Sequence, residues 1–175
     1  RFIWLLDVIG HDKYHHIDGG LPAWLAEGSP MSIQVPPAVG GPVALTLHEE
    51  PTATREYLQS RLGAADLAIW DARGPLEYSG EKVLAAKAGH IPGAVNFEWT
   101  AGMDKARQLR IRTDMPQILE DLGITKDKEI ITHCQTHHRS GFTYLVAKSL
   151  GYPRVKGYAG SWGEWGNHPD TPVEI

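Results

Sequence analysis

The stretch of sequence that decides the fold is IITHCQTHHRSGF, residues 130–142. An apolar run leads into the chain's only cysteine, Cys134, and a helix is expected to begin after Arg139. In such a strand–loop–helix turn, backbone N–H groups can point inward to bind an anion, and the start of the helix adds partial positive charge. The stretch therefore predicts an α/β fold with a thiol held in an anion-binding loop.

Short strands and helices alternate along the rest of the chain. Strands are expected at residues 67–71, 95–97, 129–133 and 155–158, and helices at residues 52–62, 114–123 and 142–150. Asp114 is a candidate helix cap, and Gly151 is a candidate helix end. Short buried strands that alternate with helices predict a mainly parallel sheet with helices on both faces. Such sheets bind ligands outside the carboxyl ends of their strands, where Cys134 is expected to lie.

The first fifty residues have a different character. Residues 1–10 carry an apolar helical stripe, with Trp4, Leu5, Val8 and Ile9, that ends at Gly10. Pro30, Pro36, Pro37 and Pro42 then predict an extended linker over residues 28–50. A shift of 141 residues places Gly10 over Gly151, Gly19 over Gly160 and Trp24 over Trp165. We therefore expect residues 1–27 to be the end of a duplicated first copy; a lone helical extension is the alternative.

Composition narrows the classes of function. The 175 residues include 17 Lys and Arg against 21 Asp and Glu, a net charge of −4, which argues against nucleic acid or a membrane surface as the main partner. No apolar run approaches the roughly 20 residues that span a bilayer. A single Cys cannot form an internal disulfide, so we expect a reducing compartment and a cytoplasmic location.

The surroundings of Cys134 favour a thiolate. Arg139 brings a permanent cation, His137 and His138 add partial charge or hydrogen bonds, and Cys pKa values at such helix starts fall from about 8.5 to roughly 3.5–7.5. We expect a reactive, exposed thiolate. The alternatives are a buried, inert thiol and histidines that only line the loop surface. A zinc site made of Cys134, His133 and His138 is disfavoured because no second Cys or acidic ligand lies nearby, so no metal is expected.

Four stretches of the sequence resemble the signatures of a known family. The loop Cys134–Arg139 is similar to the active-site loop of rhodanese sulfurtransferases, in particular the bacterial two-domain members. Three further stretches are similar to family signatures: residues 71–80, which begin Asp71-Ala72-Arg73; residues 89–96, GHIPGAVN; and residues 158–165, YAGSWGEW. The resemblance covers residues 67–165.

The resemblance implies a rhodanese-like fold and sulfur transfer by double displacement. It implies that Cys134 forms a persulfide, that no other cofactor is needed, and that the partners are small molecules. The donor would be thiosulfate, and the acceptor cyanide, a small thiol or a thiol protein. The implied substrate-binding residues are Gln135, Thr136, His137, His138 and Arg139, with Asp71 and Arg73 as a supporting ion pair. Residues 1–27 would end a non-catalytic first domain, residues 28–50 would link the domains, and residues 51–175 would form the catalytic domain.

The chain departs from the family pattern in ways that leave the donor open. Glu77 stands where many thiosulfate-active members have a basic residue, and His137 or His138 stands where they have glycine. Near the signature at residues 89–96, Ala86 stands where many members have an aromatic. Another donor such as 3-mercaptopyruvate therefore stays an alternative. The loop also resembles the active-site signature of cysteine phosphatases and arsenate reductases. The phosphatases, however, have five residues between Cys and Arg, whereas this chain has four between Cys134 and Arg139. A non-catalytic binding module is the last alternative. We expect structural roles for His90, Trp99, Trp162, Glu164 and Trp165.

Overall fold

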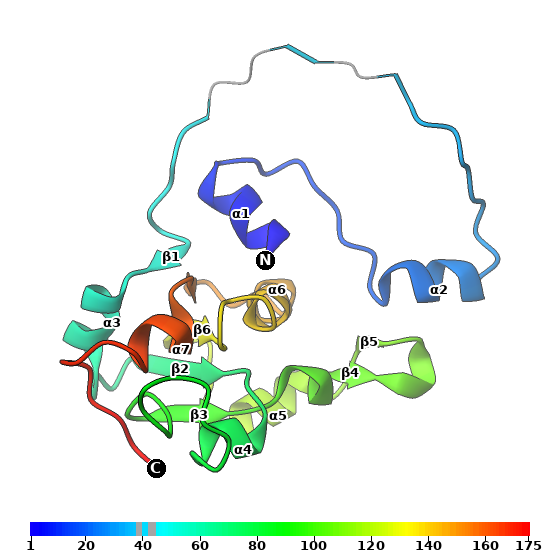
Figure 1. Ribbon diagram of the computed structural model, residues 1–175. Helices are drawn as coiled ribbons and strands as arrows, with labels where there is room; N and C mark the ends of the chain where they lie inside the picture. Colours follow the sequence, from blue (N-terminus) through cyan, green and yellow to red (C-terminus); the bar gives the residue numbers. More distant parts are fainter. Residues whose placement is uncertain (38–39, 42–44) are drawn as a thin grey trace.

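A computed structural model describes residues 1–37, 40–41 and 45–175 (Figure 1). Its helices are α1 (Phe2–Val8), α2 (Gly20–Ala26), α3 (Arg55–Arg61), α4 (Pro75–Tyr78), α5 (Met115–Asp121), α6 (Ser140–Ser149) and α7 (Ser161–Trp165). Its strands are β1 (Thr52–Ala53), β2 (Leu67–Asp71), β3 (Ala94–Asn96), β4 (Met103–Asp104), β5 (Arg110–Ile111), β6 (Glu129–His133) and β7 (Val155–Tyr158).

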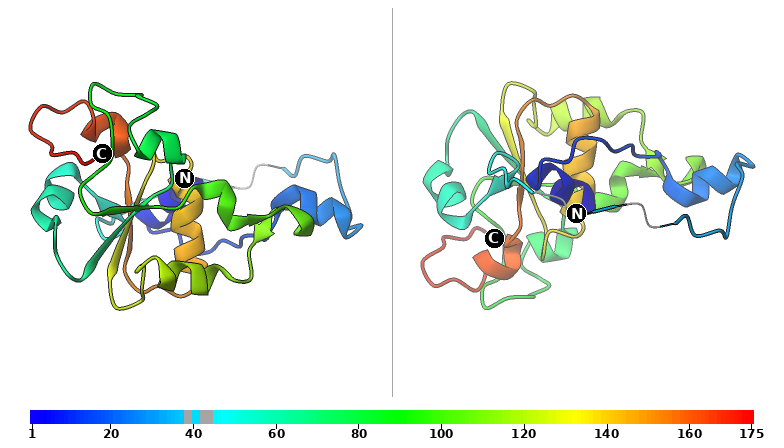
Figure 2. Two further views of the ribbon diagram at one scale, coloured as in Figure 1. Left: turned by 90° about the horizontal axis from the view of Figure 1, so that it is seen from below. Right: turned by 90° about the horizontal axis from the view of Figure 1, so that it is seen from above.

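The centre of the fold is a five-stranded sheet in the order β1-β7-β6-β2-β3, in which every neighbouring pair is parallel. Successive side chains of a strand point to opposite faces. Ile69 and Ile131 accordingly pack in one core with Leu58 of α3 and Trp162 of α7. Helices cover both faces of the sheet, with α3 and α7 on one side and α5 and α6 on the other (Figure 2).

The second core lies on the opposite face of the sheet. Trp70 and Ile130 pack there against Leu119 of α5 and Val146 of α6. Both faces of the central strands thus carry an apolar cluster, which explains why Leu67–Trp70 and Ile130–Ile131 read as continuous apolar runs rather than as alternating ones. The predicted α/β architecture, a mainly parallel sheet between helices, is confirmed.

Several predicted boundaries need correction. The strands at 67–71, 129–133 and 155–158 have the predicted limits, whereas the strand predicted at 95–97 lies one residue earlier. Thr52 and Ala53 were expected in a helix but pair with β7, and Thr54 instead caps α3 by accepting a hydrogen bond from Tyr57 N–H at 3.1 Å. Pairing with the sheet satisfies backbone groups that a first helical turn would leave free.

Two helix ends also differ from the predictions. The Asp114 side chain does not cap α5, because both of its oxygens accept hydrogen bonds from the Arg112 guanidinium, at 2.9 and 2.6 Å. The helix predicted at 142–150 begins two residues earlier, at Ser140, so that the loop runs directly into it. Gly151 follows the end of α6 with φ +75°, a left-handed conformation that glycine adopts without strain.

The N-terminal segment runs along the outside of the domain. The predicted opening helix is α1, which packs against α6 with Trp4 buried, although Leu5 of the predicted stripe is exposed. α2 lies beside the antiparallel β4–β5 ribbon, where Asp18 accepts a hydrogen bond from Ile111 N–H at 2.8 Å. The described part of the predicted linker between residues 29 and 48 has neither helix nor strand; Pro42 falls outside the described residues. Among the described residues, no helix has the length and apolarity that a membrane crossing requires.

Candidate active site

The predicted loop joins β6 to α6 at the carboxyl end of the central strands. Cys134 directly follows β6, and Arg139 directly precedes α6. β6 is flanked by β2 and β7, and their carboxyl ends point the same way because the pairs are parallel. The loop therefore occupies the edge of the sheet at which α/β folds bind ligands.

Hydrogen bonds from α7 fix how the loop peptides are turned. Trp162 N–H donates to the Cys134 carbonyl and Gly163 N–H to the Gln135 carbonyl, both at 2.9 Å. A trans peptide holds its C=O and N–H on opposite sides, so a carbonyl drawn toward α7 sends the next N–H the other way. The N–H of Thr136 is thereby directed toward the Cys134 sulfur, and its hydrogen bonding is one of the causes that lower the pKa of Cys134.

Cys134 is buried, with 1% of its surface exposed, which corrects the prediction of an exposed thiolate. The loop encloses the sulfur with its own donors. Burial opposes the charged form, but hydrogen bonds from the Ser140 hydroxyl and from the N–H groups of Ser140 and Thr136, together with the Arg139 charge, outweigh it, so the pKa of Cys134 is lowered. Cys134 is thus buried without being the inert thiol that burial alone would give.

His137 does not carry the partial charge predicted for it. Its side chain is fully buried, and burial lowers its pKa to about 3, so the ring is neutral at physiological pH. Its Nδ1 lies 2.8 Å from Ser140 Oγ. The backbone of His137 has φ +58°, the left-handed region that favours glycine.

The other predicted loop residues are less enclosed. The Gln135 side chain donates to the Leu84 carbonyl at 3.2 Å, and Thr136 is exposed apart from its backbone contacts. His138 is exposed, and its Nε2 lies 3.0 Å from an Arg1 guanidinium nitrogen; the same nitrogen donates to the Thr136 carbonyl at 3.3 Å. Among the described residues, no three His, Cys, Asp or Glu side chains converge as metal ligands.

Arg139 forms an ion pair that sequence analysis missed. Its two terminal nitrogens donate to the two carboxylate oxygens of Glu77, at 2.7 and 2.8 Å. The hydrogen bond from Arg139 lowers the pKa of Glu77, so the carboxylate is charged and compensates part of the Arg139 charge. Glu77 also accepts from Gly74 N–H at 3.2 Å, which holds it at the start of α4. The two residues lie 62 positions apart, so no local pattern indicates the pair.

Asp71 and Arg73 form the predicted supporting ion pair beneath the loop. Arg73 Nη2 lies 2.6 Å from Asp71 Oδ2, and both side chains are buried. Burial alone would raise the pKa of Asp71, but His133 and Arg73 lower it further than burial raises it. The Arg73 guanidinium also stacks over the Trp162 ring, 4.4 Å from its centroid. This contact connects the end of β2 to α7, the helix whose N–H groups bind the loop carbonyls.

The residues expected to be structural have such contacts. His90 donates its Nδ1–H to the Tyr78 carbonyl, 2.9 Å away, and its ring stacks on the Tyr78 ring. Trp162 and Trp165 belong to the core, Glu164 accepts from the Tyr158 hydroxyl at 2.7 Å, and Trp99 contacts the edge of Phe142. Sequence analysis also missed Ser140, although it directly follows the loop.

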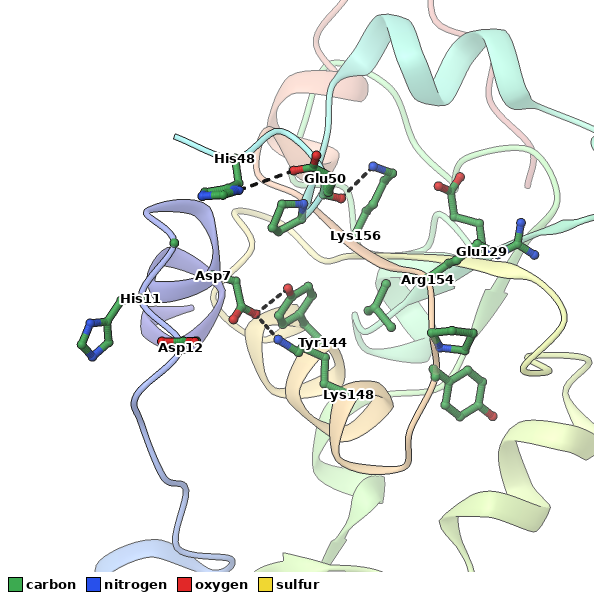
Figure 3. A pocket seen from close by; sticks show the side chains of 15 residues that line it. Asp7, His11, Asp12, His48, Glu50, Glu129, Tyr144, Lys148, Arg154 and Lys156 are labelled. Atoms are coloured by element: carbon green, nitrogen blue, oxygen red, sulfur yellow. Dashed lines mark hydrogen bonds and ion pairs between the residues drawn. The ribbon is translucent and has the colours of Figure 1, made fainter. Parts of the chain in front are cut away.

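A separate cleft of about 680 Å³ lies at the opposite ends of β6 and β7, between α1 and α6 (Figure 3). Figure 3 shows Asp7 of α1 facing Tyr144 and Lys148 of α6, which donate to it at 2.7 and 2.5 Å. Lys156 donates to the Glu50 carbonyl at 2.7 Å. These groups form their hydrogen bonds with one another rather than with a ligand. The bonds from Tyr144 and Lys148 to Asp7 hold α1 against α6.

Comparisons with known proteins agree with this geometry. The model of the rhodanese-like domain matches residues 54–168. A thiosulfate sulfurtransferase of Pseudomonas aeruginosa is 78% identical over all 175 residues, and one of Azotobacter vinelandii is 77% identical. The sulfur carrier protein TtuD of Thermus thermophilus is 34% identical over 97% of the chain. The chain spans 65% of the length of the first two relatives and 64% of the third.

Solved structures support the same fold. An anaerobic ergothioneine biosynthesis enzyme from Chlorobium limicola, bound to trimethyl histidine, aligns with a TM-score of 0.87 and 25% identity. The alignment covers the whole of this chain and 44% of that one. A complex of the EanB Y353A variant with ergothioneine gives a TM-score of 0.88 at 24% identity, over 99% of this chain and 44% of that one.

Proposed function

Because the chain belongs to the rhodanese family, as the domain match over residues 54–168 shows, we propose that it is a thiosulfate sulfurtransferase. It moves sulfane sulfur from thiosulfate to a thiophilic acceptor through a persulfide on Cys134. The observation that carries the proposal is the placement of Cys134 in the loop between β6 and α6, at the carboxyl edge of the sheet and with Arg139 at the start of α6. The relatives named thiosulfate sulfurtransferase, at 78% and 77% identity, support the choice of donor.

In the first half-reaction the Cys134 thiolate attacks the outer sulfur of thiosulfate. The bond between the two thiosulfate sulfurs breaks, its electron pair leaves with sulfite, and a Cys134 persulfide remains. The donors that surround the sulfur stabilise the thiolate before the transfer and the negative persulfide after it. Because the same donors stabilise both the thiolate and the persulfide, and the pKa of Cys134 is lowered, no separate general base is required.

In the second half-reaction an acceptor attacks the outer sulfur of the persulfide. With cyanide, a carbon–sulfur bond forms, the sulfur–sulfur bond breaks, and thiocyanate leaves while the Cys134 thiolate is regenerated. A thiol, either small or on a protein, would serve as acceptor in the same way. Apart from this covalent sulfur the reaction uses no cofactor, and a reducing, cytoplasmic location would keep Cys134 free between turnovers.

Arg139 is the donor-binding cation, with Gln135, Thr136, His137 and His138 forming the rest of the loop. Both terminal nitrogens of Arg139 already donate to the Glu77 carboxylate. Thiosulfate must therefore compete with Glu77 for the hydrogen bonds and the charge of the Arg139 guanidinium. A less charged donor such as 3-mercaptopyruvate would meet less repulsion from Glu77. The choice between these donors is therefore decided at the Glu77–Arg139 pair.

Thiocyanate formation by the 175-residue chain tests the proposal. Wild-type protein should turn over with thiosulfate and cyanide, and Cys134→Ser should abolish turnover while circular dichroism shows an unchanged fold. Arg139→Ala should chiefly raise the KM for thiosulfate. Gln117→Ala, on the exposed face of α5, is the control and should behave as wild type. Turnover by Cys134→Ser, or release of phosphate from an aryl phosphate in place of thiocyanate, would refute the assignment.

A further inference from the structure

Two buried side chains next to Cys134 form a hydrogen-bonded pair that the reaction as described does not use. His137 and Ser140 are both fully buried, and His137 Nδ1 lies 2.8 Å from Ser140 Oγ. Among the groups that lower the pKa of Cys134, the Ser140 hydroxyl has the largest effect, by hydrogen bonding to the sulfur. Ser140 thus stands between the imidazole and the nucleophile.

The number of available protons determines the direction of this chain of hydrogen bonds. A serine hydroxyl has one proton to donate and can accept as well. If that proton went to His137, none would remain for the thiolate, which is itself only an acceptor. Ser140 can donate to Cys134 while bonded to His137 only if His137 carries its proton on Nδ1 and donates it to Ser140.

The other ring nitrogen favours the same tautomer. His137 Nε2 is buried and has no hydrogen-bond partner among the described residues. A proton on Nε2 would therefore bury an N–H without an acceptor, which costs more than burying a lone pair. The surroundings of both ring nitrogens therefore favour a neutral His137 that is protonated at Nδ1.

Two neighbours hold the ring in this orientation. Trp4 of α1 meets it edge-on, with ring centroids 4.8 Å apart and an interplanar angle of 81°. Gly157 of β7 leaves room for it, because a Cβ there would lie 2.4 Å from His137 Nε2. Trp4 is itself fixed by its indole N–H, which donates to the Pro51 carbonyl at 2.9 Å. The ring has little freedom to flip and reverse its hydrogen bonds.

We propose that His137 and Ser140 are positioning residues for Cys134: the His137 Nδ1–H donates to Ser140 Oγ, and the Ser140 hydroxyl proton is thereby directed at the Cys134 sulfur. The role rests on the proposed function, since it serves the thiolate and the persulfide of that reaction. It is nevertheless testable on the thiol alone. The charged and titratable groups around the site are Arg139 with its partner Glu77, His133 with Asp71, His138, and the side chain and amino group of Arg1; the variants below alter none of them.

The test is the pH dependence of Cys134 alkylation by iodoacetamide, which reports the thiolate because the chain has no other Cys. Ser140→Ala should move the midpoint upward by about one pH unit, the effect of removing one hydrogen bond to an ion, and reduce the rate near neutral pH up to about tenfold. Ser149→Ala, at the exposed far end of α6, is the matched control and should keep the wild-type midpoint. A wild-type midpoint for Ser140→Ala overturns the proposal.

Two variants of His137 separate hydrogen bonding from backbone shape. Asn and Gly both tolerate the left-handed backbone at this position, but only Asn offers an N–H in place of Nδ1–H. His137→Asn should stay near the wild-type midpoint, and His137→Gly should move in the direction of Ser140→Ala. Equal midpoints for Asn and Gly would show a purely structural role and overturn the proposal. Because alkylation needs no sulfur donor, failure to form thiocyanate with these midpoints as predicted would count against the proposed function alone.

Discussion

Gly163→Ala tests whether α7 sets the orientation of the catalytic loop. Gly163 N–H donates to the Gln135 carbonyl at 2.9 Å, and a Cβ on residue 163 would lie 2.9 Å from that same oxygen. Carbon atoms do not approach a backbone oxygen so closely, and the oxygen cannot swing away as the end of a flexible side chain could. The Gln135–Thr136 peptide must therefore turn, which moves the Thr136 N–H away from the Cys134 sulfur.

The expected size of the effect follows from that single lost hydrogen bond. A hydrogen bond to a charged group contributes about 1.5–3 kcal/mol, which corresponds to roughly one to two pH units in the pKa of Cys134. Overpacking should lower the free energy of unfolding by about 1–3 kcal/mol. Alkylation of Cys134 against pH measures the first quantity, and urea unfolding measures the second.

Gly40→Ala is the matched control, because a methyl group there meets no atom of the described residues within 4 Å. It should leave both quantities at their wild-type values. A Gly163→Ala protein with the wild-type alkylation midpoint would refute the reasoning that carbonyls held by α7 direct the loop N–H groups.

Three further predictions concern the charged pairs. Asp71→Asn leaves Arg73 buried without its carboxylate and should cost about 3–5 kcal/mol in urea unfolding; a loss below about 1 kcal/mol would contradict a supporting role. Glu77→Gln frees Arg139 for thiosulfate and should raise kcat/KM for that donor about fivefold, or about 1 kcal/mol, with a smaller gain for 3-mercaptopyruvate; equal gains would show that Glu77 does not discriminate. The pKa values of Asp71 and Glu77 are lowered on folding, so their stabilisation is complete above their unfolded pKa values near 4 and is lost as the pH falls through the folded ones. Unfolding free energies measured between pH 7 and pH 3 should fall on acidification, and Asp71→Asn and Glu77→Gln should each flatten that fall.

Sequence predicted the parts of the fold that local patterns encode. β2 and β6 have the predicted boundaries because their apolar runs are buried, and β7 because it lies between loop residues on both sides. β1 was missed because a two-residue strand has no period of its own and exists only through its pairing with β7. The duplication and the domain limits predicted for residues 1–50 remain predictions.

The candidate site was predictable as a location but not as a network of contacts. The position of Cys134 between a strand and a helix follows from sequence, as does the ion pair of Asp71 with Arg73, which are two residues apart. The burial of Cys134 and the pairing of Arg139 with Glu77 depend on how distant segments meet. The left-handed backbone of His137, which turns its ring into the core, could not be inferred from a residue that more often lies on the surface.

In the proposed reaction Cys134 carries the transferred sulfur. This is tested by the mass of the intact chain and of its Cys134 peptide after incubation with thiosulfate, removal of the excess, and addition of cyanide. We predict a gain of one sulfur atom on Cys134 that departs as an equal amount of thiocyanate. A folded protein whose Cys134 reacts with iodoacetamide but gains no sulfur from thiosulfate would contradict it.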